Sequence, residues 1–318
     1  MIERTIKTPE FTANSAVLLL AYGGPDRLED IPEYLADIRG GRPTPKALVD
    51  DIVERYRLIG GRSPLLEITQ KTAEKLQEWI GLPVFVGMRH WSPRIQEAVS
   101  QMTVDGVDQI TAICMAPHYS DLSIGKYREQ LEKALEADDK SISVDFISSW
   151  HLQPDYLKGV SIEINRGLNR WPEERREQVT VIFTAHSLPA HILDNGDPYD
   201  RQLRETSEAL VNELDLPKGR WLFSYQSAAT TGVPWLGPQI EEVVADMGKE
   251  GHKDLIIAPI GFIADHVEIL YDIDIGVQKI AKEYGIRLER TAMLNDSDFL
   301  VAALSSLIEI TKETTRGH

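Results

Sequence analysis

Two separate segments carry the side chains best suited to acid–base or metal chemistry. His186 directly follows an apolar run, and imidazole both titrates near neutral pH and binds metal ions readily. His266 and Glu268 follow a second apolar run, and Asp272 lies four residues after Glu268, on the same face of an expected helix. One histidine with one or two carboxylates has too few ligands to retain a metal, which suits proton transfer or passing a metal on. Taken singly, these residues also fit a buried histidine and an acidic first turn of a helix.

A basic segment and several aromatic residues are candidates for binding a flat, anionic ligand. In a chain of net charge −16, residues 39–62 carry a net charge of +3, with Arg39, Arg42, Lys46, Arg55, Arg57 and Arg62 against Asp50, Asp51 and Glu54. Guanidinium groups match carboxylates with two parallel hydrogen bonds, which favours an anion site, although a solvated helical face explains the same charges. The candidates for stacking on an apolar ring are His90 with Trp91, Trp235 and Phe262, each of which also fits a place in the core.

Several common motifs are missing from the sequence. The glycine pairs at 23–24, 40–41 and 60–61 do not form GxGxxG, and neither GxxxxGK[ST] nor GxSxG occurs. Dinucleotide binding, a P-loop and a hydrolase nucleophile therefore lose their usual support. Cys114 is the only cysteine, which excludes an internal disulfide, a Cys-ligated zinc site and an iron–sulfur cluster within the chain. We expect neither a nucleotide cofactor nor a cluster.

Short apolar runs alternate with longer amphipathic stretches along the chain. The strand candidates are residues 16–21, 84–86, 110–115, 144–147, 179–184, 221–224, 255–259 and 287–290. The helix candidates are residues 28–38, 45–56, 68–80, 92–105, 124–137, 155–170, 198–214, 237–249 and 297–311. This alternation predicts βαβ units whose parallel sheets are buried on both faces.

The pattern runs twice, which predicts an α/β protein of two similar Rossmann-like (flavodoxin-like) domains. We expect a first domain over residues 14–152 and a second over 153–296, with the C-terminal helix 297–311 able to pack back on the first. Polar residues follow the strands: Tyr22, then His118, in the first half, and His186, then Glu268, in the second. Because ligands bind at the carboxyl ends of parallel strands, we expect the active site in the cleft between the domains.

The composition restricts the class of protein. With 42% hydrophobic and 26% charged residues the chain is globular, and its acidic excess argues against a general nucleic-acid surface. The longest apolar runs are too short to span a bilayer, and residues 1–14 lack the apolar core of a signal peptide. We expect a soluble, cytoplasmic monomer with no membrane span and no nucleic-acid partner.

Six ordered motifs resemble those of the ferrochelatases, which insert ferrous iron into a porphyrin. They are LAYGGP at 20–25, RY followed by IGGRSPL at 55–65, TAHSLP at 184–189, GDPY at 196–199, YQS with WLGP at 225–238, and GFIADHVEILYDID at 261–274. The resemblance covers nearly the whole chain. It implies a lyase of haem biosynthesis whose substrates are a porphyrin and Fe²⁺, together with a transient protein that accepts the product as a conceivable partner.

The resemblance also implies roles for individual residues. His186 and Glu268 match the catalytic pair that faces the porphyrin nitrogens, and Tyr22 matches a metal-contacting tyrosine on the other side of the ring. Together with Asp272, these residues are the candidate metal contacts. The candidate substrate-binding residues are Tyr22, Arg39, Arg55, Ser63, Arg89, His90, Tyr127, Trp235 and Phe262, of which Arg39, Arg55, Ser63 and Tyr127 match residues that hold propionates.

Two departures from the family pattern concern the metal and the substrate. Gly276 occupies the place of a third acid one turn beyond Asp272, with Asp274 as an alternative acid. Gln226-Ser227 is followed by Ala228, where many protoporphyrin-using relatives have arginine. Together with WLGP and VEILYD, this resembles the coproporphyrin III branch found in monoderm bacteria. The basic segment 39–62 also favours coproporphyrin III, because that porphyrin has four propionates and protoporphyrin IX has two.

Three alternatives remain open at this point. The chain could be a ferrochelatase for protoporphyrin IX, or a non-catalytic protein on the same scaffold that binds a tetrapyrrole or a metal. It could also be a chelatase for another metal or macrocycle, such as cobalt and sirohydrochlorin, although such a protein would not need WLGP and the GFxxDHxE segment together.

Overall fold

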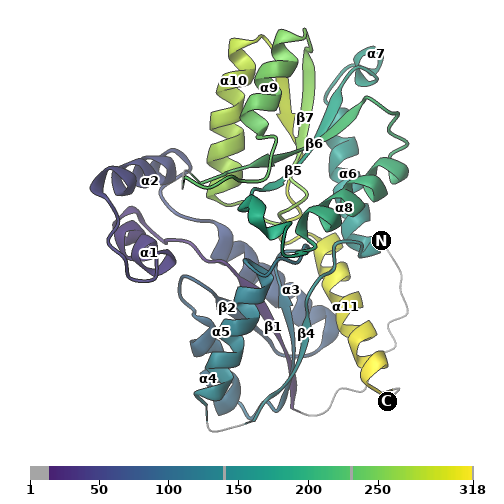
Figure 1. Cartoon of the computed structure of the whole chain (residues 1–318). Coiled ribbons are helices and arrows are strands. Elements are labelled where there is room, and N and C mark those ends of the chain that lie inside the picture. The colour runs from purple at the N-terminus through teal and green to yellow at the C-terminus, as the bar shows by residue number, and fades with distance from the viewer. Residues whose placement is uncertain (1–13, 139–140, 230–231, 317–318) are drawn as a thin grey trace.

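Two four-stranded parallel sheets form the two halves of the molecule (Figure 1). The computed structural model describes residues 14–138, 141–229 and 232–316. The first sheet contains β1 (Ser15–Ala21), β2 (Val84–Met88), β3 (Gln109–Cys114) and β4 (Ser143–Ile147), in the order β2-β1-β3-β4. The second contains β5 (Thr180–His186), β6 (Trp221–Gln226), β7 (Asp254–Ala258) and β8 (Arg287–Arg290), in the order β6-β5-β7-β8. The two halves therefore have the same topology, as the repeated sequence pattern predicts.

Helices flank both sheets. The α-helices of the first half are α1 (Ile31–Ile38), α2 (Lys46–Leu58), α3 (Leu65–Ile80), α4 (Ile95–Val104) and α5 (Ile124–Glu136). Further along the chain are α6 (Pro154–Leu168), α7 (Glu173–Arg176), α8 (Tyr199–Glu213), α9 (Ile240–Lys249), α10 (Gln278–Glu283) and α11 (Asp298–Arg316). Two 3₁₀ turns, η1 (Leu28–Asp30) and η2 (Ala190–Ile192), and a π-helix, η3 (Glu268–Val277), complete the described elements. Each predicted strand is present, and the predicted two-domain α/β fold is confirmed.

The strands are apolar because both faces of each sheet are covered. Every residue of β1 is buried, and Leu18, Leu19 and Leu20 are fully inaccessible. Leu18 and Leu20 pack with α4 and α5 on one face, whereas Leu19 packs with α3 and α11 on the other. Each such side chain stabilises the fold by about 1.5–3 kcal/mol relative to exposure, which explains why the strands read as near-continuous hydrophobic runs.

The C-terminal helix α11 links the two halves. It packs against α3 of the first half and against α6, which follows the connection after β4 (Figure 1). Its apolar face, with Leu300, Leu304 and Ile308, shares a core with Leu19 of β1. The predicted boundary at residues 152 and 153 lies in the loop between β4 and α6 and remains a prediction. No helix of the described ranges is long and apolar enough to cross a membrane.

The strand order determines where a ligand can bind. In each half, the second and third strands in the chain lie on opposite sides of the first strand within the sheet. In such sheets ligands bind in a crevice where the strand order reverses, which is at the carboxyl ends of β1 and β3 and of β5 and β7. Tyr22 and His118 follow β1 and β3, while His186 ends β5 and Glu268 follows β7. Both crevices therefore supply the polar side chains that the sequence places at strand ends.

Candidate active site

A cavity of about 330 Å³ lies between the two halves, within the range typical of small-molecule sites. Its wall combines aromatic and apolar side chains with a few polar ones from both sheets. The polar and aromatic lining residues are Tyr22, Tyr34, Tyr56, Ser63, Arg89, His118, Ser123, Tyr127, His186, Tyr199, Phe262, His266 and Glu268. The predicted residues Tyr22, Ser63, Arg89, Tyr127, His186, Phe262 and Glu268 thus meet in one cavity.

His186 faces Glu268 with one defined ring nitrogen. Its Nδ1 makes a short hydrogen bond to the carbonyl oxygen of Ser187, so this nitrogen carries the proton and donates it. Nε2 then lies 3.4 Å from Glu268 Oε1. Burial alone would lower the pKa of His186, but the charge of Glu268 and its hydrogen bond outweigh burial and raise the pKa above its ordinary value. His186 is therefore a proton acceptor that Glu268 strengthens.

Glu268 contacts a second histidine. Its Oε2 lies 3.6 Å from His266 Nε2, while His266 Nδ1 is bonded to the Ala264 carbonyl oxygen at 3.0 Å. Burial alone would raise the pKa of Glu268, but the two histidines outweigh this effect and lower the pKa below its ordinary value. Glu268 is therefore ionised at neutral pH. The sequence places His266 in the same polar segment as Glu268 but does not assign it a catalytic or binding role.

Close backbone packing sets the separation of these two side chains. A Cβ on Gly261 would lie 2.4 Å from Ala185 Cβ and 2.8 Å from its Cα, so only glycine lets the loop after β7 approach the end of β5. Gln226 at the end of β6 ties the same region together. Its Oε1 accepts from the Thr184 hydroxyl at 2.7 Å, and its Nε2 donates to the Glu268 carbonyl oxygen at 3.0 Å.

Tyr22 and Arg89 line the part of the wall that the first domain contributes. Burial of the Tyr22 phenol, with the negative charge of Glu268, raises its pKa to about 12. At neutral pH Tyr22 therefore presents a neutral hydroxyl, and acting as an anionic metal ligand would require loss of that proton. The Arg89 guanidinium lies 5.9 Å from the centre of the Tyr22 ring and 5.5 Å from that of Tyr127. Its Nε is buried without a hydrogen-bond partner among the described residues.

Two glycines explain why separate motifs of the first domain meet here. A Cβ on Gly24 would lie 2.5 Å from Ser63 Cβ, so LAYGGP and IGGRSPL must pack through this glycine. Gly23 has φ of +91°, a backbone conformation that residues other than glycine rarely adopt. A Cβ on Gly23 would also lie 2.9 Å from Trp91 Cβ. These contacts bring Ser63 to the cavity beside Tyr22.

Trp235 and Phe262 both lie near histidines of the site. The Trp235 ring centre is 6.3 Å from that of His186, and the Phe262 ring centre is 4.7 Å from that of His266. The loop of Trp235 is held at the end of β5, because the Leu236 amide donates to the Leu188 carbonyl oxygen at 2.8 Å. Phe262 lines the cavity, whereas Trp235 lies beside His186 without forming part of the lining.

Asp272 lies outside the cavity lining. Its Oδ2 accepts from the Ser227 hydroxyl at 2.5 Å, and its Oδ1 lies 3.4 Å from Arg55 Nη1. Burial is the main reason that its pKa is raised to about 6, and the charge of Glu268 adds to the rise. The segment is a wide π-helix, and the other acid, Asp274, is committed to Arg290 at 2.7 Å. Asp274 therefore does not extend the row of acids begun by Glu268 and Asp272.

The remaining predicted residues, Arg39, Arg55 and His90, are not part of the lining. Arg39 ends α1, and its buried Nε has no partner among the described residues. Arg55 pairs with Asp51 at 2.9 Å as well as with Asp272, so its charge is already engaged. His90 is buried with Nδ1 2.8 Å from Asp37, burial lowers its pKa, and its ring packs 4.6 Å from Tyr22. His90 therefore supports Tyr22 from behind.

Several lining residues were not predicted as site residues. Tyr34 and Tyr56 come from α1 and α2, and burial raises the pKa of both phenols. Tyr199 donates a hydrogen bond to the His186 carbonyl oxygen at 3.0 Å. For Tyr199 and Tyr56 a signal existed in the GDPY and RY motifs, and for His118 in its place after β3. Nothing in the periodicity of α1 marks Tyr34.

The side chains of the cavity suit brief contact with a cation better than permanent metal binding. Within residues 14–138, 141–229 and 232–316, no group of three or more His, Cys, Asp or Glu side chains is placed to hold a metal ion. His186 and Glu268 offer one nitrogen and one carboxylate facing the cavity. Such a site can accept protons and contact a metal in passing, and its aromatic walls with Arg89 suit a flat ligand that carries carboxylates.

Comparison with known proteins gives consistent results. A sequence model of the family described as Ferrochelatase matches residues 14–312. The chain is 44% identical over 298 residues to the ferrochelatase of Deinococcus radiodurans, covering 92% of this chain and 94% of that protein. It is 36% identical over 300 residues to the coproporphyrin III ferrochelatase of Geobacillus thermodenitrificans, covering 92% and 94%.

A solved structure shares the fold at low sequence identity. The sirohydrochlorin chelatase SirB from Bacillus subtilis subspecies spizizenii, in complex with cobalt, superposes with a TM-score of 0.59 at 11% identity. The match covers 96% of this chain and 98% of SirB. At this identity the match establishes the two-domain fold alone.

Proposed function

Because this chain belongs to the ferrochelatase family of lyases, which insert a metal ion into a porphyrin, we propose that it inserts Fe²⁺ into coproporphyrin III. Metallation removes two pyrrole protons from the ring and turns the nitrogen lone pairs towards the metal. The cavity must therefore hold a flat macrocycle, accept protons and admit a cation. The residues described above supply a group for each task.

His186 is the proton acceptor in this proposal. Its Nδ1 is occupied by the Ser187 carbonyl oxygen, so Nε2 is the nitrogen that takes a pyrrole proton. Glu268, ionised and 3.4 Å from Nε2, stabilises the imidazolium that forms. General-base help of this kind accelerates a reaction by about 10²–10⁴-fold. Glu268 also attracts the incoming Fe²⁺, and the neutral Tyr22 hydroxyl contacts the ring from the other domain.

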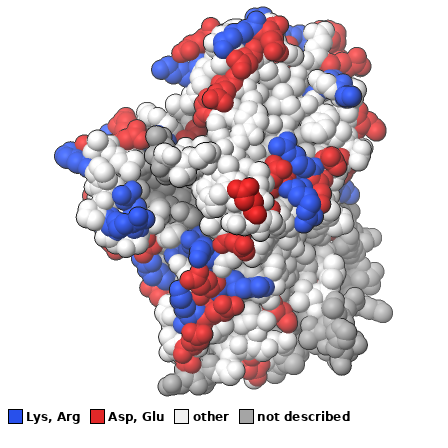
Figure 2. Space-filling model, in the orientation of Figure 1, with Lys and Arg blue, Asp and Glu red and all other residues white. Residues whose placement is uncertain are grey.

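One observation carries the choice of porphyrin: two of the predicted substrate-binding arginines have buried Nε–H groups without partners among the described residues. These are Arg89, in the lining, and Arg39, at the end of α1. A buried donor without an acceptor is costly, which favours a ligand that supplies one. Figure 2 shows Lys and Arg side chains on the lobe of α1 and α2 beside a hollow in the surface. Coproporphyrin III carries a propionate on each pyrrole, whereas protoporphyrin IX carries its two on neighbouring pyrroles, so donors on separate elements favour coproporphyrin III.

Two further features support the same substrate. A relative from Geobacillus thermodenitrificans with 36% identity is a coproporphyrin III ferrochelatase. Ala228 follows the YQS motif, so the arginine that many protoporphyrin-using relatives have after QS is missing from this loop. The relative from Deinococcus radiodurans, at 44% identity, is named only as a ferrochelatase, so the preference rests on the residues of this chain.

The test is metal insertion with each porphyrin in turn. Purified protein is incubated with Fe²⁺ without oxygen, in one tube with coproporphyrin III and in another with protoporphyrin IX, and the absorption bands of the metalloporphyrin are followed. The proposal predicts efficient turnover of coproporphyrin III and slow or no turnover of protoporphyrin IX. Preference for protoporphyrin IX would overturn the choice of substrate, and stoichiometric binding without insertion in both tubes would overturn the reaction.

A further inference from the structure

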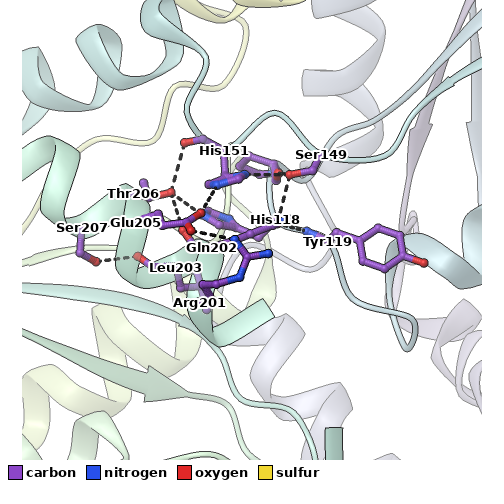
Figure 3. A network of polar contacts seen from close by, with 11 residues as sticks. His118, Tyr119, Ser149, His151, Arg201, Gln202, Leu203, Glu205, Thr206 and Ser207 are labelled. Carbon is purple, nitrogen blue, oxygen red and sulfur yellow. Dashed lines mark hydrogen bonds and ion pairs between the residues drawn. The ribbon is translucent and has the colours of Figure 1, made fainter. Parts of the chain in front are cut away.

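A network of hydrogen bonds joins the two domains, and Figure 3 shows the part of it around Gln202, Glu205 and Thr206. It links the loops after β3 and β4 of the first domain to α8 of the second. We call it the interdomain network and define it by His118, Tyr119, Ser120, Asp121, Ser149 and His151 on one side and by Asp197, Gln202, Glu205 and Thr206 on the other. None of these residues has a role in the proposed chemistry, although His118 lines the cavity.

The central contacts converge on Gln202 and Glu205 of α8. Gln202 Oε1 accepts from the Tyr119 amide at 2.7 Å and from the Ser149 hydroxyl at 3.1 Å. Glu205 Oε2 lies 2.8 Å from His151 Nε2, and its other oxygen lies 2.7 Å from Arg201 (Figure 3). One helix face thus holds backbone and side chains from two loops of the other domain.

The contact of His118 has a defined direction. Its Nε2 lies 2.8 Å from the Thr206 hydroxyl, which is also 3.1 Å from the His151 carbonyl oxygen and 3.0 Å from that of Gln202. A hydroxyl has one proton, and the carbonyl oxygens can only accept, so Thr206 donates to one of them and accepts from His118 Nε2–H. Nε2 is therefore a protonated ring nitrogen of His118, and this contact fixes His118 to α8.

Asp197, in the GDPY motif, joins the same two parts at a second point. Its Oδ2 accepts from the Ser120 hydroxyl and from the Asp121 amide, each at 2.8 Å. Its Oδ1 accepts from the Tyr199 amide at the start of α8, at 3.0 Å. Asp197 and Ser120 are both buried. One oxygen of this carboxylate thus accepts a hydrogen bond from α8, and the other accepts hydrogen bonds from the loop of the first domain.

This loop and this helix each continue into the cavity wall. Leu122 and Ser123 follow the two residues that Asp197 holds, and both line the cavity. Tyr199 follows Asp197 on the other side, lines the same cavity, and donates to the His186 carbonyl oxygen. A change at Asp197 should therefore alter the positions of cavity-lining residues in both domains.

We propose that Asp197 is a positioning residue for porphyrin binding, because it holds residues 117–123 against α8 in the conformation that shapes the cavity. The inference rests on the porphyrin chelation proposed above and not on which porphyrin is used. A loop that is released from Asp197 must be ordered again whenever substrate binds. The apparent affinity then falls in proportion to the fraction of molecules in which the loop is in place.

Asp197→Asn is the main test. The asparagine side chain has a single carbonyl oxygen, which can accept hydrogen bonds from the helix or from the loop but not from both. We expect the KM for porphyrin to rise about threefold to tenfold, while kcat changes less than twofold and the KM for Fe²⁺ is unchanged. Backbone hydrogen exchange at Tyr119 and Asp121 should become faster. Ser120→Ala removes one of the two loop contacts and should shift the porphyrin KM in the same direction by less, so it decides the matter if Asp197→Asn does not fold.

The matched control is Asp254→Asn. Asp254 is equally buried and accepts from Trp171 Nε1 at 2.7 Å and from Arg175 Nε at 3.1 Å, but it lies at the start of β7, away from the cavity. The Asp254→Asn variant should have lower thermal stability than the wild type but the same KM for porphyrin. The inference is overturned if Asp197→Asn and Ser120→Ala leave the porphyrin KM unchanged, or if the control raises it as much. A wild-type protein that metallates no porphyrin would instead overturn the proposed function.

Discussion

His186 and Glu268 form a base whose strength depends on a neighbouring charge. Glu268 raises the pKa of His186 by stabilising the imidazolium, and the histidines in turn lower the pKa of Glu268. A stronger base takes a pyrrole proton more readily, but it is also protonated already at a higher pH. Activity should therefore fall on the acidic side as His186 becomes protonated.

The pH profile tests this coupling. Glu268→Gln removes the charge that raises the pKa of His186, so the pKa falls and the neutral base persists to lower pH. We expect the acidic limb of kcat/KM to move to lower pH, with a lower maximum because the imidazolium is no longer stabilised. Glu163→Gln, at a carboxylate of α6 that is paired with Arg166, is the control and should leave the profile unchanged. An acidic limb that stays in place or moves to higher pH would show that His186 is not the titrating base.

At this scale the sequence predicts which residues line the cavity better than it predicts the contacts that those residues make. His186, Glu268, Tyr22 and Arg89 follow strand ends, which the alternation of apolar runs locates. The engagement of Arg55 by Asp51 and Asp272, and the burial of His90 behind Tyr22, depend on contacts between residues far apart in the chain. No local pattern encodes such contacts.

Glycines at the ends of elements let strands and loops approach closely enough to build the site. Gly261 lets the loop after β7 lie on Ala185, next to His186, and Gly24 does the same for Ser63. Gly276 differs, because a Cβ there would meet only the Tyr271 carbonyl oxygen, at 3.7 Å. Its place within η3 is therefore not required by packing.

The two kinds of glycine give opposite predictions. Gly261→Ala forces backbone apart next to His186, which should cost about 1–3 kcal/mol of stability and lower kcat by up to about 10²-fold, since small misplacements are costly in catalysis. Gly276→Ala should raise the melting temperature by about 1–3 °C and leave kcat unchanged. Both are checked by thermal unfolding and steady-state kinetics. Normal kcat in Gly261→Ala would show that this close approach does not position His186.

The elements themselves were largely predictable, and their exceptions have physical causes. All strands follow from apolar periodicity, and so do the flanking helices except α7 and α10, which were not predicted. The short α7 and η2 are too brief for periodicity to reveal. The expected helix after residue 265 is a π-helix over Glu268–Val277, a geometry that apolar periodicity does not distinguish from an α-helix.

The two domains meet at a buried polar interface, which makes the stability of the whole molecule depend on pH. Burial, with a smaller effect of His151, lowers the pKa of His118 well below its value of 6.5 in an unfolded chain. Below pH 6.5 the unfolded state therefore binds a proton that the folded state excludes. Stability is fully retained above that pH and is lost as the pH falls further.

His118→Gln tests this linkage, because the amide can still donate to Thr206 but does not titrate. The free energy of unfolding should fall less steeply between pH 6.5 and 5 in the variant, by up to about 1.4 kcal/mol per pH unit. Denaturant unfolding at several pH values measures it. His252→Gln, at an exposed histidine, should leave the slope as in the wild type. Equal slopes for wild type and His118→Gln would mean that His118 is not excluded from protonation in the folded state.

Charge distribution over the whole molecule underlies the choice of porphyrin. The chain has a net charge of −16, so an anionic substrate must find local positive charge. Arg39 and Arg89 supply donors without partners among the described residues, whereas Arg55 is engaged by two aspartates. We therefore assign selectivity to Arg39 and Arg89 together.

The most direct test is the ratio of kcat/KM for coproporphyrin III to that for protoporphyrin IX, measured for the wild type and for the Arg39→Gln/Arg89→Gln variant. A matched variant, Arg166→Gln, removes an exposed arginine of α6 that is paired with Glu163. The account predicts a ratio well above one in the wild type and in Arg166→Gln, and a ratio that falls towards one in the double variant. A wild-type ratio at or below one, or a ratio that the double variant leaves unchanged, would contradict it.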